Sequence, residues 1–157
     1  MAEESIVEGL PASRIQIGVE ADAKPDIIRE LLEGLERVGV IQGVEGALAE
    51  FLQRESKGST GIGNGIAIPH VRSAQVSQLE FYFANSKDGV DFESLDGEPI
   101  HLLFMMMAPL SSQGSHIKAL ARISRILNDE SVRARLKDAT DPEEVRSILA
   151  EREEEIG

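Results

Sequence analysis

The alternation of strand patterns with helical stripes limits the possible folds of this chain more than any other feature. Residues 15–19 alternate between apolar and polar side chains, which predicts a half-buried strand. Apolar runs at 79–84 and 100–107 predict two buried strands, and Lys-Asp-Gly at 87–89 predicts a turn between them. A short apolar run at 66–68 predicts a fourth strand. A sheet of several strands is therefore expected.

Helical stripes separate and follow these strands. Apolar residues recur at helical spacing within residues 27–38, 44–52, 117–127 and 129–136. A last helix is expected to begin at Asp141, which offers a capping side chain, with proline at the first helical position and glutamate three residues after the cap. Strands mixed with helices predict one α/β domain, residues 1–157, whose sheet has helices on both faces.

Composition and charge argue against several classes of function. The chain has no cysteine, which excludes disulfides, thiolate metal sites and cysteine nucleophiles and fits a reducing cytoplasm. A formal net charge of −12 argues against nucleic acid as a partner and favours a basic protein. The longest apolar run, residues 102–109, is too short to span a bilayer, and the acidic start Met-Ala-Glu-Glu predicts no secretory signal. We therefore expect a cytoplasmic protein without membrane insertion.

Residues 58–70, Gly-Ser-Thr-Gly-Ile-Gly-Asn-Gly-Ile-Ala-Ile-Pro-His, carry most of the functional information. The four glycines, at 58, 61, 63 and 65, are expected to take positive φ values and to let the backbone approach a ligand closely. Pro69 is expected to end the hydrogen-bond ladder of the strand before it. His70 would then lie at the rim of a sheet, beside a glycine loop, with its ring free to act.

The glycine pattern is not that of a nucleotide-binding loop. A P-loop ends in Gly-Lys-Ser/Thr, which is absent here. The dinucleotide pattern is G-x-G-x-x-G after a strand and before a helix, whereas this chain has G-x-G-x-G after a helix and before a strand. The glycines can also simply form a compact turn, and this alternative stays open.

His70 has three possible roles on this pattern alone. A metal ligand needs neighbours, but the other histidines are His101 and His116, with no H-x-x-x-H spacing. A nucleophile or general base suits an imidazole with an ordinary pKa of about 6.5, because such a ring is mostly neutral at neutral pH. In that role the other ring nitrogen needs an acceptor, which the sequence does not identify. A structural hydrogen bond is the third possibility.

Two further residues are candidates for a site around this histidine. His116 begins the helix after residues 111–115, where its ring could meet an anion held by the unpaired amides of the helix end. Arg54 closes the helix before the glycines. An ordinary helix-end position explains His116 at least as well, and on this pattern alone it is the preferred explanation of Arg54. His101 and the three methionines at 105–107 are interpreted as structural.

Residues 58–70 closely resemble the active-site segment of enzyme IIA domains of the bacterial phosphoenolpyruvate phosphotransferase system. The class is the fructose/mannitol type, which includes nitrogen-regulatory members. The resemblance runs from about Ile15 to Ile148 and is therefore far more specific than a short glycine pattern. It includes Arg54-Glu55, Asp91-Phe92, Asp96-Gly97-Glu98-Pro99-Ile100, Leu102-Leu103-Phe104, Pro109 and His116-Ile117.

This resemblance implies a role for each matching residue. His70 would be the phosphorylated histidine, which in this family takes the phosphoryl group on Nε2 from a phosphohistidine of the carrier protein HPr. His116 would steady the phosphoryl group, and Arg54 would lie near it. The family fold is a three-layer α/β/α sandwich with a mixed β-sheet. No metal or cofactor is implied, because the donor is already an activated phosphoramidate, and the basic surface of HPr would suit an acidic acceptor.

The resemblance leaves the branch of the family open. Residues 58–70 look more like the nitrogen-regulatory branch, which signals its phosphorylation state to target proteins. A sugar-specific member would instead pass phosphate to a IIB domain of a fructose/mannitol-type transporter. A third alternative, which no residue favours, is a binding module in which His70 is never phosphorylated. Family members commonly have glycine or alanine after the histidine, whereas this chain has Val71. A β-branched residue restricts the backbone conformation at this position, so the contact surface beside the site is expected to differ.

Overall fold

Strand β6 lies at the centre of a six-stranded mixed sheet in a computed structural model that describes residues 5–157. The strands are β1 (Ile15–Ile17), β2 (Gly61–Gly63), β3 (Ile66–Ala67), β4 (His70–Ser73), β5 (Glu80–Val90) and β6 (Ile100–Pro109). β6 pairs antiparallel with β5 on one side and parallel with β3 and β4 on the other. β1 adds parallel to β5, and β2 adds antiparallel to β3. The acidic start, residues 1–4, lies outside the described residues.

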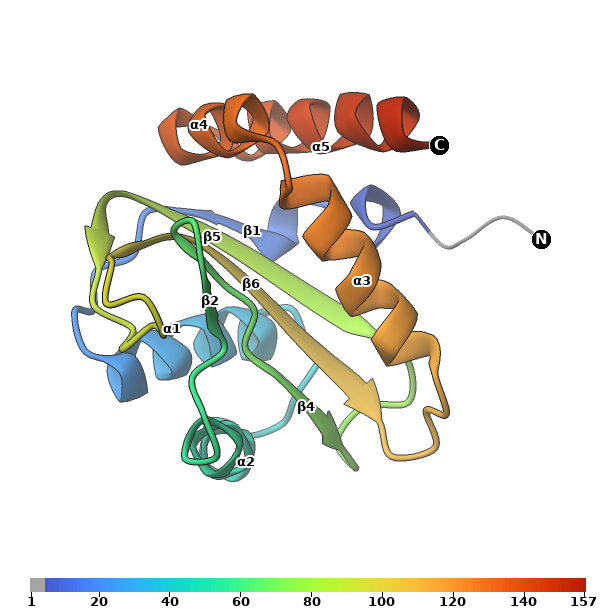
Figure 1. Ribbon diagram of the computed structural model, residues 1–157. Coiled ribbons are helices and arrows are strands. Elements are labelled where there is room, and N and C mark those ends of the chain that lie inside the picture. The colour runs from blue at the N-terminus through green and yellow to red at the C-terminus, as the bar shows by residue number, and fades with distance from the viewer. Residues whose placement is uncertain (1–4) are drawn as a thin grey trace.

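Helices cover both faces of this sheet (Figure 1). One face carries α1 (Lys24–Arg37) and α2 (Val44–Glu55), and the other carries α3 (Ser115–Leu127), α4 (Glu130–Asp138) and α5 (Pro142–Ile156). Two 3₁₀ turns, η1 (Val7–Gly9) and η2 (Ala12–Arg14), precede β1. The predicted α/β class, a three-layer α/β/α sandwich with a mixed sheet, is confirmed. Within residues 5–157, no helix combines the length and apolar character needed to cross a membrane.

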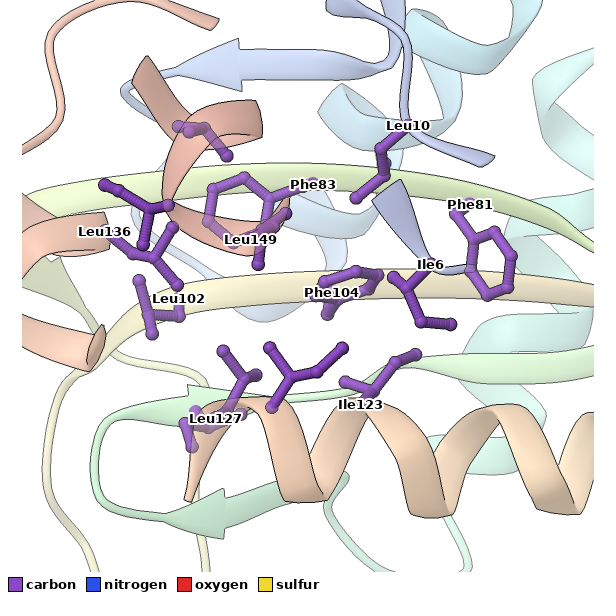
Figure 2. Close-up of a cluster of buried hydrophobic side chains, with 14 of the residues drawn as sticks. Ile6, Leu10, Phe81, Phe83, Leu102, Phe104, Ile123, Leu127, Leu136 and Leu149 are labelled. Atoms are coloured by element: carbon purple, nitrogen blue, oxygen red, sulfur yellow. The ribbon is translucent and has the colours of Figure 1, made fainter. Parts of the chain in front are cut away.

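Each face of the sheet has its own hydrophobic core, because side chains alternate between the faces along a strand. The core under α3, α4 and α5 takes Leu102, Phe104 and Met106 from β6, and the core under α1 and α2 takes Leu103, Met105 and Met107. Figure 2 shows the first core, where Phe104 packs edge-on against Phe83 and Phe81, with ring centroids 5.6 and 6.2 Å away. The three methionines are at most 1% exposed, so the prediction that they fill the core is confirmed.

The predicted turn at residues 87–89 is wrong, because this segment forms a bulge inside β5. The residues between Asn85 and Val90 of β5 face only His101 of β6, so the excess backbone leaves the ladder. Turn-forming residues suit a bulge as well as a turn, and the glycine at its end has a φ of +87°. His101 Nδ1 lies 2.8 Å from the Ser86 carbonyl oxygen, so this histidine is a structural partner of the bulge.

Pro69 does not end the ladder, contrary to the prediction. Proline lacks an N–H, but its carbonyl still accepts a hydrogen bond from the Met106 N–H at 2.9 Å. β3 stops before Pro69, β4 begins after it at His70, and both pair with β6. The strand is interrupted rather than ended. His70 therefore lies within the sheet opposite Met106, not beyond the end of a ladder.

The ends of the other elements follow the prediction closely. The side chain of Asp141 accepts a hydrogen bond from the Glu144 N–H at 3.0 Å, which confirms the predicted cap of α5. The strand expected over 15–19 is shorter, because the chain turns at Gly18 with a φ of +85°. α1 ends one residue before Val38, whose side chain is then 36% exposed.

Candidate active site

The glycine-rich segment folds into a β-hairpin, β2–β3, rather than a loop. Its two-residue turn consists of Asn64 and Gly65, with φ values of +57° and +76°, the left-handed conformation that Asn-Gly turns readily adopt. Two of the other three glycines also have positive φ, as predicted, but Gly61 does not. Gly61 is needed for space, because a Cβ there would lie 2.5 Å from the Cβ of Ser94. These backbone requirements, rather than a nucleotide, explain the glycines.

His70 is the first residue of β4, and its ring is partly buried. Its Nδ1 lies 2.6 Å from the carbonyl oxygen of Ile68. Because a carbonyl oxygen can only accept a hydrogen bond, Nδ1 must carry the proton. The neutral ring then keeps an unshared electron pair on Nε2. The Ile68 carbonyl is thus the acceptor that the sequence left unidentified.

The surroundings of His70 favour its neutral form. Burial of the ring lowers the pKa of His70 below its ordinary value of 6.5. The hydrogen bond to the Ile68 carbonyl opposes this shift in pKa. The positive charge of Arg54 lowers the pKa further, the negative charge of Glu55 raises it, and His116 lowers it slightly more. At neutral pH, the ring is therefore uncharged and able to act as a nucleophile.

We expect the His70 ring to titrate below pH 6.5 in the folded chain and near pH 6.5 in the chain unfolded by urea. Well above pH 6.5 the ring is neutral in both states and does not make stability depend on pH. As the pH falls below 6.5, the unfolded chain binds the proton first, so His70 lowers the free energy of unfolding. Ring ¹H–¹⁵N NMR spectra measure both midpoints, and a folded midpoint at or above 6.5 contradicts this expectation.

His116 is the second residue of α3, in the first turn of the helix. Its Nδ1 lies 2.8 Å from the hydroxyl of Ser112, which lies 3.0 Å from the hydroxyl of Ser115. Val71 packs against the core under α1 and α2, so alternation along β4 directs His70 toward the opposite face, where α3 begins. The predicted position of His116, at a helix end that attracts anions, agrees with this geometry.

Arg54 lies in the last turn of α2, where its guanidinium donates a hydrogen bond to the Gly58 carbonyl at 2.8 Å. This bond joins the helix to the first residue of the glycine-rich segment. Arg54 and His116 both lie close enough to act on the charge of His70. The structure thus brings the three residues selected from the sequence into one region. Their roles in phosphoryl transfer stay predictions.

Two charged residues near this site were not selected from the sequence. Lys24 and Glu55 form an ion pair, and each is only 8% exposed. Glu55 follows Arg54 and continues the buried stripe of α2, which also contains Ala47 and Phe51. A carboxylate on an otherwise apolar helical stripe is the sequence signal that could have identified Glu55. Within residues 5–157, no group of three or more His, Cys, Asp or Glu side chains is arranged to hold a metal ion.

Similar proteins of known sequence include sugar-specific components and nitrogen regulatory proteins. The family described as "Phosphoenolpyruvate-dependent sugar phosphotransferase system, EIIA 2" matches residues 8–152. This range includes the resemblance that was expected from about residue 15 to residue 148. The chain is 39% identical over 144 residues to a fructose-specific EIIABC component of Bacillus subtilis, covering 92% of this chain and 23% of that protein. It is 40% identical over 100 residues to a nitrogen regulatory protein of Bradyrhizobium diazoefficiens, covering 64% of this chain and 65% of that protein. The matched part is therefore less than two thirds of either relative.

Solved structures of both kinds are also similar to this chain. The nitrogen regulatory protein IIA-Ntr of Neisseria meningitidis is 34% identical, with a TM-score of 0.84 over 92% of this chain and 98% of that chain. A complex of mannitol enzyme IIA with phosphorylated enzyme IIB from Escherichia coli contains a chain that is 27% identical, with a TM-score of 0.77 over 90% of this chain and 97% of that chain. Because the family match spans nearly the whole sequence, the chain belongs to the EIIA type 2 family of the phosphoenolpyruvate-dependent sugar phosphotransferase system.

Proposed function

We propose that this chain is a phosphocarrier in which His70 accepts a phosphoryl group on Nε2 from a phosphohistidine of an HPr-type protein. The hydrogen bond from Nδ1 to the Ile68 carbonyl carries this proposal, because it leaves the electron pair of Nε2 available. In the reaction, that electron pair forms a new N–P bond while the N–P bond of the donor breaks. The donor imidazole keeps the electrons of the broken bond. Transfer between two histidines requires no metal or nucleotide.

Arg54 and His116 are proposed to stabilise the phosphoryl group during transfer. Negative charge is spread over the three equatorial oxygens of that group, so catalysis depends on positioning and on opposite charge. A guanidinium can bind two of these oxygens, and the first turn of α3 adds backbone N–H groups that have no acceptor within the helix. Both residues lower the pKa of His70 through electrostatic interaction with its ring, which supports this assignment.

The net charge supports a basic protein as the donor. A formal charge of −12 attracts a positively charged surface over a distance and thus speeds encounter more than it tightens binding. We expect an HPr-type carrier to dock over His70 and the start of α3. Such a carrier places the reaction in the cytoplasm, as the absence of cysteine also suggests.

Incubation of the purified chain with phosphoenolpyruvate, enzyme I and HPr tests this proposal. We expect one phosphate per chain, labile in acid and stable in base, as befits a phosphohistidine. Omission of HPr should prevent labelling, because HPr is the proposed direct donor. A chain that takes up no phosphate in the complete mixture would not be a phosphocarrier and would instead be a binding module.

Two downstream roles have support, and onward transfer separates them. The match to IIA-Ntr over most of both chains favours a nitrogen-regulatory role, in which target proteins respond to the phosphorylation state. The identity to a fructose-specific component over 92% of this chain favours transfer to a IIB domain. We propose the regulatory role and expect the phosphorylated chain to keep its label when mixed with fructose- and mannitol-type IIB domains. Rapid loss of label to a IIB domain would establish the sugar-transport role.

A further inference from the structure

A buried ion pair lies behind the candidate active site, between the two helices of one layer. Lys24 Nζ in α1 lies 3.0 Å from Glu55 Oε1 at the end of α2, and the same ammonium lies 5.0 Å from the centroid of the Phe92 ring. Burying two charges is costly, and well-packed apolar residues would join two helices at least as well. The pair therefore calls for a role beyond holding α1 against α2.

Glu55 has a second set of partners in the hairpin. Both its oxygens accept hydrogen bonds from Thr60, one from the backbone N–H at 3.1 Å and one from the hydroxyl. Thr60 is 3% exposed and is the last residue before β2. An apolar residue at position 55 could not accept these bonds, so two donors would be left buried without a partner.

From Thr60, two further hydrogen bonds lead to the candidate nucleophile. The Ile68 N–H donates to the Thr60 carbonyl at 3.0 Å. The Ile68 carbonyl in turn accepts the proton of His70 Nδ1 at 2.6 Å. The backbone of Ile68 is thus held on one side by Thr60 and holds the imidazole on the other. Three consecutive contacts connect the Glu55 carboxylate to the ring.

We propose that Glu55, with its charge balanced by Lys24, is a positioning residue for His70. The carboxylate fixes Thr60, Thr60 fixes Ile68, and the Ile68 carbonyl fixes the ring so that Nε2 faces the incoming phosphoryl group. This inference rests on the proposed role of His70 as phosphoryl acceptor. Small displacements of the reacting groups slow the reaction strongly. A carboxylate that prevents them can therefore offset the unfavourable free energy of its burial.

The substitution Glu55→Gln tests this inference, and Glu153→Gln is its matched control. Glu153, in α5, is also 8% exposed and also pairs with a buried cation, Arg122, at 2.8 Å. It likewise accepts hydrogen bonds from backbone N–H groups, those of Ile6 and Val7. These partners lie in the layer that covers the opposite face of the sheet from Lys24. Both variants lose a buried carboxylate, but only the carboxylate of Glu55 is connected to His70 by hydrogen bonds.

We expect Glu55→Gln to slow phosphate uptake from phospho-HPr by about tenfold or more, with Glu153→Gln close to the wild-type rate. Ring ¹⁵N shifts in Glu55→Gln should show a weaker preference for the proton on Nδ1, and the pKa of His70 should fall, because a negative charge that raises it is gone. The milder variant Thr60→Val, which keeps the ion pair, should change the ring shifts in the same direction. Circular dichroism at the assay temperature confirms that each variant is folded.

The ring measurements need no phosphoryl donor, so they separate this inference from the proposed function. If the wild type takes up no phosphate while Glu55→Gln still alters the ring, the proposed function is wrong and the positioning of His70 stands. If Glu55→Gln and Thr60→Val both keep the wild-type ring shifts and pKa of His70, Glu55 is not a positioning residue. Equal changes in Glu55→Gln and Glu153→Gln would also overturn the inference, since they would reflect a general loss of stability.

Discussion

His70→Gln is expected to abolish phosphate uptake completely. Glutamine is similar in size and keeps polar atoms for hydrogen bonding, so the fold should survive, but its amide nitrogen has no nucleophilic electron pair like that of Nε2. The measurement is radiolabel from phosphoenolpyruvate that is retained in base and lost in acid. Mass spectrometry of the intact chain gives the same result, as a missing phosphate.

The other two histidines provide the controls for this experiment. His116→Gln should still be phosphorylated, but about a hundredfold more slowly, because it removes a group that stabilises charge rather than the acceptor itself. His101→Gln should take up phosphate at close to the wild-type rate, since His101 contacts the Ser86 carbonyl in the bulge of β5. Undiminished label in His70→Gln would show that another residue is the acceptor.

Phe104→Ala is expected to lower the free energy of unfolding by about 3–5 kcal/mol. Phe104 is 0% exposed and contacts two other phenylalanine rings in the core under α3, α4 and α5. The substitution removes the buried ring and leaves a cavity that the surrounding strands cannot fill. For a chain of this length, the loss corresponds to a fall in Tm of roughly 6–20 °C, which thermal or urea unfolding monitored by circular dichroism would measure.

Leu95→Ala is the surface control for this prediction. Leu95 is 78% exposed, so its truncation should change the free energy of unfolding by no more than about 0.5 kcal/mol. Similar losses in Phe104→Ala and Leu95→Ala would contradict the assignment of Phe104 to the core. A loss below about 1 kcal/mol in Phe104→Ala would contradict it as well.

Local periodicity predicted all five helices, four of the six strands and the layers of this fold, but not the short strands β2 and β4. Apolar spacing identified the helices, and the capping pattern at Asp141 located the start of α5. The prediction of a turn at 87–89 failed because local propensity does not distinguish a turn from a bulge whose two ends pair with the same strand. That distinction depends on β6, which is distant in sequence.

The candidate residues of the site could be selected from the sequence, but most of the contacts that hold them in place could not be predicted. The Asn64-Gly65 dipeptide is a strong hairpin signal, and it could have been read from the sequence. The role of the Ile68 carbonyl as the acceptor for His70 could not be predicted, because strand pairing decides whether a backbone carbonyl is available to a side chain. Glu55 is an intermediate case, since its place on an apolar stripe was visible but its contact with Lys24 was not.

The interrupted strand at Pro69 has a consequence for the outer edge of the sheet. In a parallel ladder, alternate residues direct their carbonyls away from the neighbouring strand, and at Ile68 this is the side away from β6. Such an outward acceptor invites another chain to add a strand. Here the His70 ring occupies it through Nδ1. Phosphate on Nε2, as proposed, would leave the Nδ1 proton and this bond in place, so the Ile68 carbonyl keeps its partner in both the free and the phosphorylated form of the ring.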